Sequence, residues 1–417
     1  MDTNDAREEL DRLSAWIAGQ TEGMVALQKT LTAIPAMAPE SGGEGELAKC
    51  EALERFLSSL GFDRFERHDA PDPRVPSGLR PNLVVTVPGA CDDRSVWIMT
   101  HLDVVPPGEM EQWKTDPWTV VERDGRLYGR GVEDNQQGLV ASVFAALSFV
   151  KCGIVPPYPV KLLFVADEEV GSAYGIQYLL RERRLFAADD LVLIPDGGDE
   201  TGSTIEIAEK NLLWLRFSTK GIQTHGSRPD QGANAHLAAC DLAVSVNGLE
   251  RVFDRRDPLF DPDRSTFQPT KKEANVPNFN TIPGDDVMCM DCRILPSYGL
   301  DYVRAEISRI AREVEARHGV TISWTEEQAV ESRATAPDAP VVTALRRAVK
   351  AVYGVEARPI GVGGGTVGAY LRNAGIDAVV WSRLDETAHQ PNEYCLIDNL
   401  VGDARVMAAF SLGARGA

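Results

Sequence analysis

The spacing of apolar positions along the chain predicts where its helices and strands lie. Four apolar or β-branched runs lack helical spacing and predict buried strands. They are Leu83–Val87, Val96–Met99, Val160–Ala166 and Leu191–Ile194. Apolar residues at helical spacing predict helices, within residues 4–33, 46–60 and 139–150. Strands that alternate with helices indicate an α/β fold with a mostly parallel, doubly wound sheet.

The pattern changes near Asn211 and returns to its first form after Pro337. Between these points strands alternate with helices, over 212–219, 235–249, 287–294, 301–318 and 320–324. Residues 251–279 are rich in Asp, Pro and Arg and predict a long surface loop. We therefore predict one catalytic domain in two parts, 1–210 and 332–417, interrupted by an inserted α/β sandwich domain, 211–331.

Charge and cysteine content narrow the possible partners and compartment. The 417-residue chain has a formal net charge of −19, which argues against nucleic acid or an anionic membrane surface as a partner. No apolar run approaches the roughly 20 residues that a bilayer-spanning helix needs. The acidic N-terminus lacks the order of a signal peptide, and seven scattered cysteines fit a reducing compartment. We expect a cytoplasmic protein.

Histidine and acidic side chains gather where the predicted strands end. The candidates are His101, Asp103, Asp134, Glu168, Glu169, Asp196 and, in a later loop, His389. The carboxyl ends of parallel strands meet at one edge of a sheet, so these side chains are expected to lie together there. Two imidazoles with several carboxylates suit zinc better than calcium or magnesium. The sequence therefore predicts a zinc site at this edge.

Two spacings suggest separate roles for neighbouring candidates. Asp103 lies two residues after His101, and at a strand end this spacing points both side chains to one face. The Asp103 carboxylate is then expected to accept the second ring N–H of His101 and to set its tautomer. Glu168 and Glu169 are adjacent and do not easily share one role, so one can bind metal while the other remains free as a base.

Six short motifs carry a resemblance to a known family over nearly the whole chain. They are HLDVV, GRGVEDNQQG, DEEVGS, PDGG, HGSRPDQGANA and HQPNE, in the family's order and spacing. Each motif alone is a weak signal, but six in order are specific. The chain resembles the co-catalytic zinc metallopeptidase family of acetylornithine deacetylase, succinyl-diaminopimelate desuccinylase, glutamate carboxypeptidase, aminoacylase and several dipeptidases.

The resemblance implies two Zn²⁺ ions per chain, with Co²⁺ or Mn²⁺ as substitutes. Asp134 would bridge both ions. His101 and Asp196 would complete the ligands of one ion, and Glu169 and His389 those of the other. Glu168 matches the family's general base. The resemblance also implies a cis peptide bond between Asp134 and Asn135.

Further residues match family positions in the inserted domain and in a later loop. His225 matches a histidine that reaches a neighbouring subunit's site, so a homodimer through the inserted domain is implied, with that domain as lid. Arg293 matches an arginine that holds a substrate carboxylate; on its own residue pattern it can instead form an ion pair with Asp291. The substrate-contacting positions are matched by Asn280, Gly364, Gly365 and Thr366.

Two departures from parts of the family leave the substrate open. Asp196 stands where many deacylases have glutamate, and Gln136 and Gln137 stand where lysine is common. Our first choice is an amidohydrolase that removes an acyl group from an N-acyl amino acid or diamino acid. A dipeptidase or aminoacylase is the alternative that Asp196 favours. A metal-dependent binding protein without turnover is disfavoured, because Glu168 is present.

Overall fold

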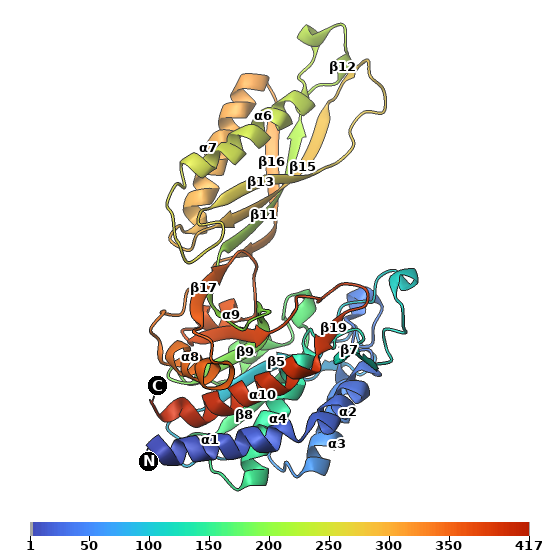
Figure 1. Ribbon diagram of the computed structural model, residues 1–417. Coiled ribbons are helices and arrows are strands. Elements are labelled where there is room, and N and C mark those ends of the chain that lie inside the picture. The colour runs from blue at the N-terminus through green and yellow to red at the C-terminus, as the bar shows by residue number, and fades with distance from the viewer. Residues whose placement is uncertain (1–2, 417) are drawn as a thin grey trace. The chain divides into compact units, whose positions relative to one another are not determined.

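The computed structural model describes residues 3–416 and divides the chain into two compact units (Figure 1). The first unit consists of 1–207, 335–360 and 370–417, and the second of 208–334 and 361–369. The segment 361–369, which we had placed in the second part of the catalytic domain, therefore belongs to the other unit. Its first residue explains this, because the Gly361 N–H donates to the Leu259 carbonyl at 2.7 Å and Gly361 lies against the ring of Phe260.

The first unit is built on an eight-stranded sheet with the strand order β1-β4-β8-β5-β9-β18-β10-β17. In chain order the strands are β1 (Phe65–Arg67), β4 (Leu83–Val87), β5 (Val96–His101), β8 (Val160–Val165), β9 (Leu191–Asp199), β10 (Thr204–Glu209), β17 (Arg358–Val362) and β18 (Ala378–Arg383). The central strands β8, β5, β9 and β18 are parallel, as predicted. The pairs β1–β4, β4–β8 and β10–β18 are antiparallel, so the whole sheet is mixed.

Helices and short strands complete the first unit. The helices are α1 (Thr3–Ala18), α2 (Thr21–Thr32), α3 (Leu47–Leu60), α4 (Gln136–Cys152), α5 (Ile176–Glu182), α8 (Pro340–Tyr353), α9 (Gly368–Asn373) and α10 (Ile397–Leu412). The short strands are β2 (Ala70–Pro71), β3 (Leu79–Arg80), β6 (Val121–Arg123), β7 (Arg126–Tyr128) and β19 (Tyr394–Leu396). Every residue of α4 from Gln136 to Phe149 is buried, because α4 packs between β5, β8 and β9 and the helices α1, α2 and α10 (Figure 1). This packing holds the N-terminus of α4, which follows Asp134, in a fixed place.

The second unit is a four-stranded antiparallel sheet with two helices packed on it. The strands are β11 (Asn211–Lys220), β13 (Thr266–Lys272), β15 (Asp285–Ile294) and β16 (Thr321–Val330), and the helices are α6 (Ala235–Asn247) and α7 (Leu300–His318). Alternate residues of β11, including Leu213, Leu215 and Phe217, point into the core under the helices. A separate ribbon pairs β12 (Thr224–His225) with β14 (Thr281–Ile282).

Strand β13 lies within the segment that we had predicted to be a long surface loop. Its sequence TFQPTKK contains Pro269, which argues against a central strand. In the structure β13 is an edge strand, and its register with β15 shifts between Pro269 and Lys271. Proline is tolerated at such a position because the missing N–H faces away from the ladder or falls at an irregularity.

None of the helices described within residues 3–416 combines the length and apolar character needed to cross a bilayer.

Candidate active site

The carboxyl ends of three adjacent parallel strands bring most of the predicted site residues together. β5 ends at His101, which is opposite Val165 in the last pair of the β5–β8 ladder. The turn after β8 carries Glu168 and Glu169 in a short 3₁₀ helix, Glu168–Val170. On the other side of β5, β9 carries Asp196. Two further residues reach this edge from loops, Asp134 before α4 and His389 between β18 and β19.

These residues form two groups of possible metal ligands that share Asp134. His101, Asp134 and Asp196 make one group, and Asp134, Glu169 and His389 make the other; within each group the ligand atoms lie within 4.8 Å of one another. The two oxygens of Asp134 are divided between them, because Oδ1 lies 2.9 Å from His101 Nε2 and Oδ2 lies 3.1 Å from His389 Nε2. The peptide bond between Asp134 and Asn135 is cis, as the resemblance implied.

Other contacts fix the remaining ligand atoms. His389 Nε2 lies 3.0 Å from Glu169 Oε2, and His101 Nε2 lies 3.6 Å from Asp196 Oδ1. The side chain of Asn135 donates to Asp196 Oδ1 at 2.6 Å. Both imidazoles therefore present Nε2 to carboxylate oxygens, which is the arrangement in which a divalent cation replaces the shared protons.

His101 is oriented differently from our expectation. Its Nδ1 is 3.0 Å from the backbone carbonyl of Asp103, with hydrogen-bond geometry, whereas the Asp103 carboxylate is 3.4 Å away. We had predicted the Asp103 carboxylate as the acceptor, but the backbone carbonyl of the same residue lies closer to the ring nitrogen. The consequence for the tautomer is the same, since an N–H at Nδ1 leaves the Nε2 lone pair available to a metal.

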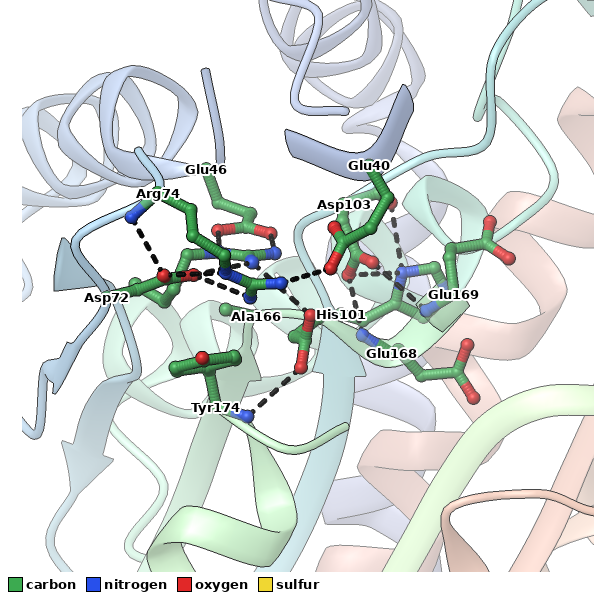
Figure 2. Close-up of polar contacts among 12 residues, drawn as sticks. Glu40, Glu46, Asp72, Arg74, His101, Asp103, Ala166, Glu168, Glu169 and Tyr174 are labelled. Atoms are coloured by element: carbon green, nitrogen blue, oxygen red, sulfur yellow. Dashed lines mark hydrogen bonds and ion pairs between the residues drawn. The ribbon is translucent and has the colours of Figure 1, made fainter. Parts of the chain in front are cut away.

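The Asp103 carboxylate instead holds the turn after β8. It accepts the backbone N–H of Glu168 at 3.1 Å and that of Glu169 at 3.0 Å (Figure 2). Within the described residues no hydrogen bond engages the side-chain carboxylate of Glu168, which is half-buried. By holding this turn, Asp103 places the Glu169 side chain against His389 and leaves the Glu168 carboxylate free.

A buried charge network lies beside this turn. Arg80 is fully buried, forms a bidentate ion pair with Glu46 and lies 3.3 Å from Asp167, the residue before Glu168. The Asp167 carboxylate also accepts the Tyr174 N–H at 3.0 Å (Figure 2). The sequence did not single out Arg80, Glu46 or Tyr174, whereas Asp167 is the first residue of the DEEVGS motif.

The charges of the site shift its pKa values in opposite directions. Burial, together with the negative charges of Asp196 and Glu169, raises the pKa of Glu168 well above its usual value. Hydrogen bonds to Asp134 and Glu169 raise the pKa of His389 to about 10. Burial alone would raise the pKa of Asp134, but hydrogen bonds from His101 and His389 hold it below its usual range. The site therefore has more carboxylates than imidazoles, and this excess of negative charge favours the binding of a cation.

The donor set fits a pair of divalent ions. Each group offers one imidazole nitrogen and two carboxylates, a set that zinc accepts with positions left for water or substrate. The shared carboxylate matches the way in which two-metal hydrolytic sites hold their ions close together.

The remaining predicted residues lie in the second unit. His225 is exposed at the end of β12, and its Nδ1 accepts the Ser227 N–H at 3.2 Å. Asn280 is in the loop before β14, and its carbonyl accepts the Gly226 N–H at 2.7 Å. The candidate metal ligands and Glu168 thus come from one unit, and the residues matched to substrate contacts come from the other.

Two of these matches have contacts of their own. Arg293 forms a bidentate ion pair with Asp291 and donates to the Gly363 carbonyl at 2.7 Å, which is the ion-pair alternative raised from the sequence. Thr366 donates through Oγ1 to Glu209 at 2.5 Å. A Cβ added at Gly364 or Gly365 would meet no atom within 4 Å, so packing does not require glycine there.

Comparison with known proteins gives the chain a family. Residues 97–412 match the model of peptidase family M20/M25/M40. A protein of Methanocaldococcus jannaschii named an uncharacterized metallohydrolase is 37% identical over 401 residues, which cover 92% of this chain and 98% of that protein. A succinyl-diaminopimelate desuccinylase of Bordetella parapertussis is 28% identical, over 72% of this chain and 78% of its own.

The fold agrees with this family. The crystal structure of aminopeptidase PepT from Bacillus cereus superposes with a TM-score of 0.77 over 95% of this chain and 99% of that chain, at 18% identity. At that identity the likeness shows the fold alone. The sequence match and the metallohydrolase relative show more: this chain belongs to peptidase family M20/M25/M40 and is a hydrolytic enzyme.

Proposed function

We propose that the protein is a zinc-dependent amidohydrolase that removes an acyl group from an N-acyl amino acid or diamino acid. The observation that carries the proposal is the geometry around Asp134, which belongs to both ligand groups, with the free carboxylate of Glu168 on the turn beside them. The desuccinylase relative supports this substrate class, since its name describes the removal of a succinyl group from a diamino acid.

His101, Asp134 and Asp196 would hold one ion and Asp134, Glu169 and His389 the other. When bound, the two ions would supply Lewis acidity toward the scissile carbonyl and the attacking water. Zinc suits the mixed imidazole and carboxylate donors, and Co²⁺ or Mn²⁺ are expected to substitute.

Glu168 would act as the general base. Its carboxylate takes a proton from the attacking water and returns it to the leaving nitrogen as the amide bond breaks. The raised pKa of Glu168 suits a group that must both accept and donate, because proton return requires an acid that is not too strong. Asp103 keeps the turn in place during both transfers, since it binds the backbone and not the reacting carboxylate.

We further propose a homodimer in which His225 acts in a partner's site. Because Nδ1 of His225 accepts the Ser227 N–H, the proton of a neutral ring would lie on Nε2, and the exposed side chain could offer that N–H as a donor. Such a donor would stabilise the oxyanion that forms from the substrate carbonyl. Arg293, Asn280, Gly364, Gly365 and Thr366 remain proposed substrate contacts.

A dipeptidase or aminoacylase of the same family is the second candidate. It is favoured by the aspartate at position 196, where many deacylases have glutamate. Both candidates use the same base and ligands, so they differ only in the group that flanks the scissile amide.

A hydrolysis screen separates the two. Zinc-loaded protein is assayed with N-acetyl and N-succinyl amino and diamino acids beside a panel of dipeptides, with Glu168→Gln as the background control. Turnover of N-acyl diamino acids above the dipeptides supports the first proposal. Turnover of dipeptides alone overturns it in favour of the second candidate, and activity that persists equally in Glu168→Gln belongs to a contaminant or to another base.

A further inference from the structure

Two buried glutamates lie next to the candidate ligands, and neither has a role in the proposed chemistry. Glu133 directly precedes Asp134 and is 4% exposed, and Glu393 follows His389 by four residues and is fully buried. A buried carboxylate is costly unless it is hydrogen-bonded, so their partners indicate what they stabilise.

Glu393 holds the loop that carries Asp134. One of its oxygens accepts from Arg130 Nη1 at 2.6 Å and from the Gly131 N–H at 3.0 Å. The other accepts the N–H of Glu133 at 2.9 Å and that of Asp134 itself at 3.1 Å. Three backbone donors within four residues are therefore fixed from the His389 side of the site.

Glu133 holds the loop that carries His389. Its Oε1 accepts the Asp385 N–H at 2.9 Å. Its Oε2 accepts the backbone N–H of Thr387 and the Thr387 hydroxyl, the latter at 2.8 Å. His389 itself has φ of +62°, in the left-handed region that side chains rarely adopt, so its loop needs such external support.

We propose that Glu133 and Glu393 form a reciprocal clasp that positions the metal ligands Asp134 and His389. Each glutamate belongs to one ligand's loop and binds the backbone of the other's. The loops are about 250 residues apart in sequence, and this exchange of hydrogen bonds sets the distance between the two ligands. Both glutamates are positioning residues, and the inference rests on the proposed metal site.

The clasp predicts that changes at Glu393 and at Glu133 affect different numbers of metal positions. Asp134 belongs to both ligand groups, so disturbing its loop through Glu393 affects both metal positions. His389 belongs to one group only, so disturbing its loop through Glu133 affects that position and spares the group of His101, Asp134 and Asp196. A glutamate that merely stabilised the fold would show no such difference between positions.

Metal binding by Glu393→Gln and Glu133→Gln tests the clasp. Each substitution keeps the side-chain volume but replaces one acceptor oxygen by a donor. Equilibrium dialysis against zinc gives stoichiometry and affinity, and Co²⁺ absorption spectra report the geometry of each position without any assay of activity. Glu393→Gln is expected to weaken both positions by about 10- to 100-fold, and Glu133→Gln only one by a similar factor.

Asp190→Asn is the matched control. Asp190 is 3% exposed and accepts three N–H groups, from Ser95, Trp97 and Ala187, at the opposite ends of β5 and β9. Its loss lowers the stability of the fold in a comparable way without touching a ligand loop. If Glu393→Gln does not fold, Thr387→Val removes one donor to Glu133 and is expected to weaken the same single position as Glu133→Gln, by less.

The outcomes separate the clasp from the proposed function. A wild-type protein that binds two ions, with variants indistinguishable from the Asp190→Asn control, overturns the clasp alone. Equal weakening of both positions by Glu133→Gln also overturns it. A wild-type protein that binds no divalent ion overturns the metal site and the clasp together.

Discussion

The loops that carry the candidate metal ligands and the loop that carries His225 are held in contrasting ways. In the first unit, Asp103, Glu133 and Glu393 are buried carboxylates that each bind two or more backbone N–H groups of a ligand loop. In the second unit, His225 is exposed, and its loop is held by a two-residue ribbon and by the Gly226–Asn280 hydrogen bond.

The contrast is what we expect if the proposed metal site is complete within one chain and His225 acts in a partner's site, as proposed above. Ligand geometry that must be accurate to a fraction of an ångström is built from rigid, buried contacts. A residue that meets its target only after assembly needs exposure, and its loop can be lightly held.

The largest effect is expected from Glu168→Gln. The variant should keep both metals but lose about 10³- to 10⁴-fold in kcat, because the proton acceptor is gone while every ligand remains. Metal content by elemental analysis and steady-state rates measure this. Glu169→Gln is the contrasting variant and should lose metal; if it instead retains both ions and Glu168→Gln loses one, the two roles are exchanged.

His225→Ala should lower kcat by about 10²- to 10³-fold, as removal of one oxyanion donor does. If His225 acts in a partner's site, combining the His225→Ala and Glu168→Ala variants restores activity, because a hybrid dimer contains one site with both residues intact. Dissociated and reassociated mixtures are assayed against each parent. Verified hybrids without activity, or a fully active monomer, contradict the in-trans role.

Asp103→Asn should reduce kcat or metal affinity by about 10- to 100-fold. The amide keeps one acceptor oxygen, so one of the two N–H groups of the turn loses its partner. The same assays apply, with Asp190→Asn as the control for a buried carboxylate outside the site. A variant with wild-type rates and metal content would show that the turn is rigid without Asp103.

Zinc affinity should rise with pH by up to about tenfold per unit across the neutral range. In the metal-free site the carboxylate partners raise the pKa of His389 to about 10 from 6.5, so zinc must displace a proton. The same proton stabilises the metal-free fold below pH 6.5 and is lost as the pH approaches 10. Dialysis at several pH values, with proton release on zinc addition, measures it; a flat profile contradicts the shift.

Much of the fold followed from periodicity. The predicted strand 83–87 is β4, and the predicted helix 301–318 begins one residue earlier as α7. The edge strands β1 and β13 were missed, because their residues pair through the backbone and carry little apolar pattern.

The sequence by itself determined the element pattern, the ordered motifs and the ligand types, because these depend on residue identity and on spacing along the chain. Only the tertiary structure decided that the backbone carbonyl of Asp103 orients His101 and that the Asp103 carboxylate holds the turn of Glu168. The same is true of the hydrogen bonds by which Glu133 holds the loop of His389 and Glu393 holds the loop of Asp134. These contacts join segments up to about 260 residues apart in sequence, and they depend on packing that no local pattern records.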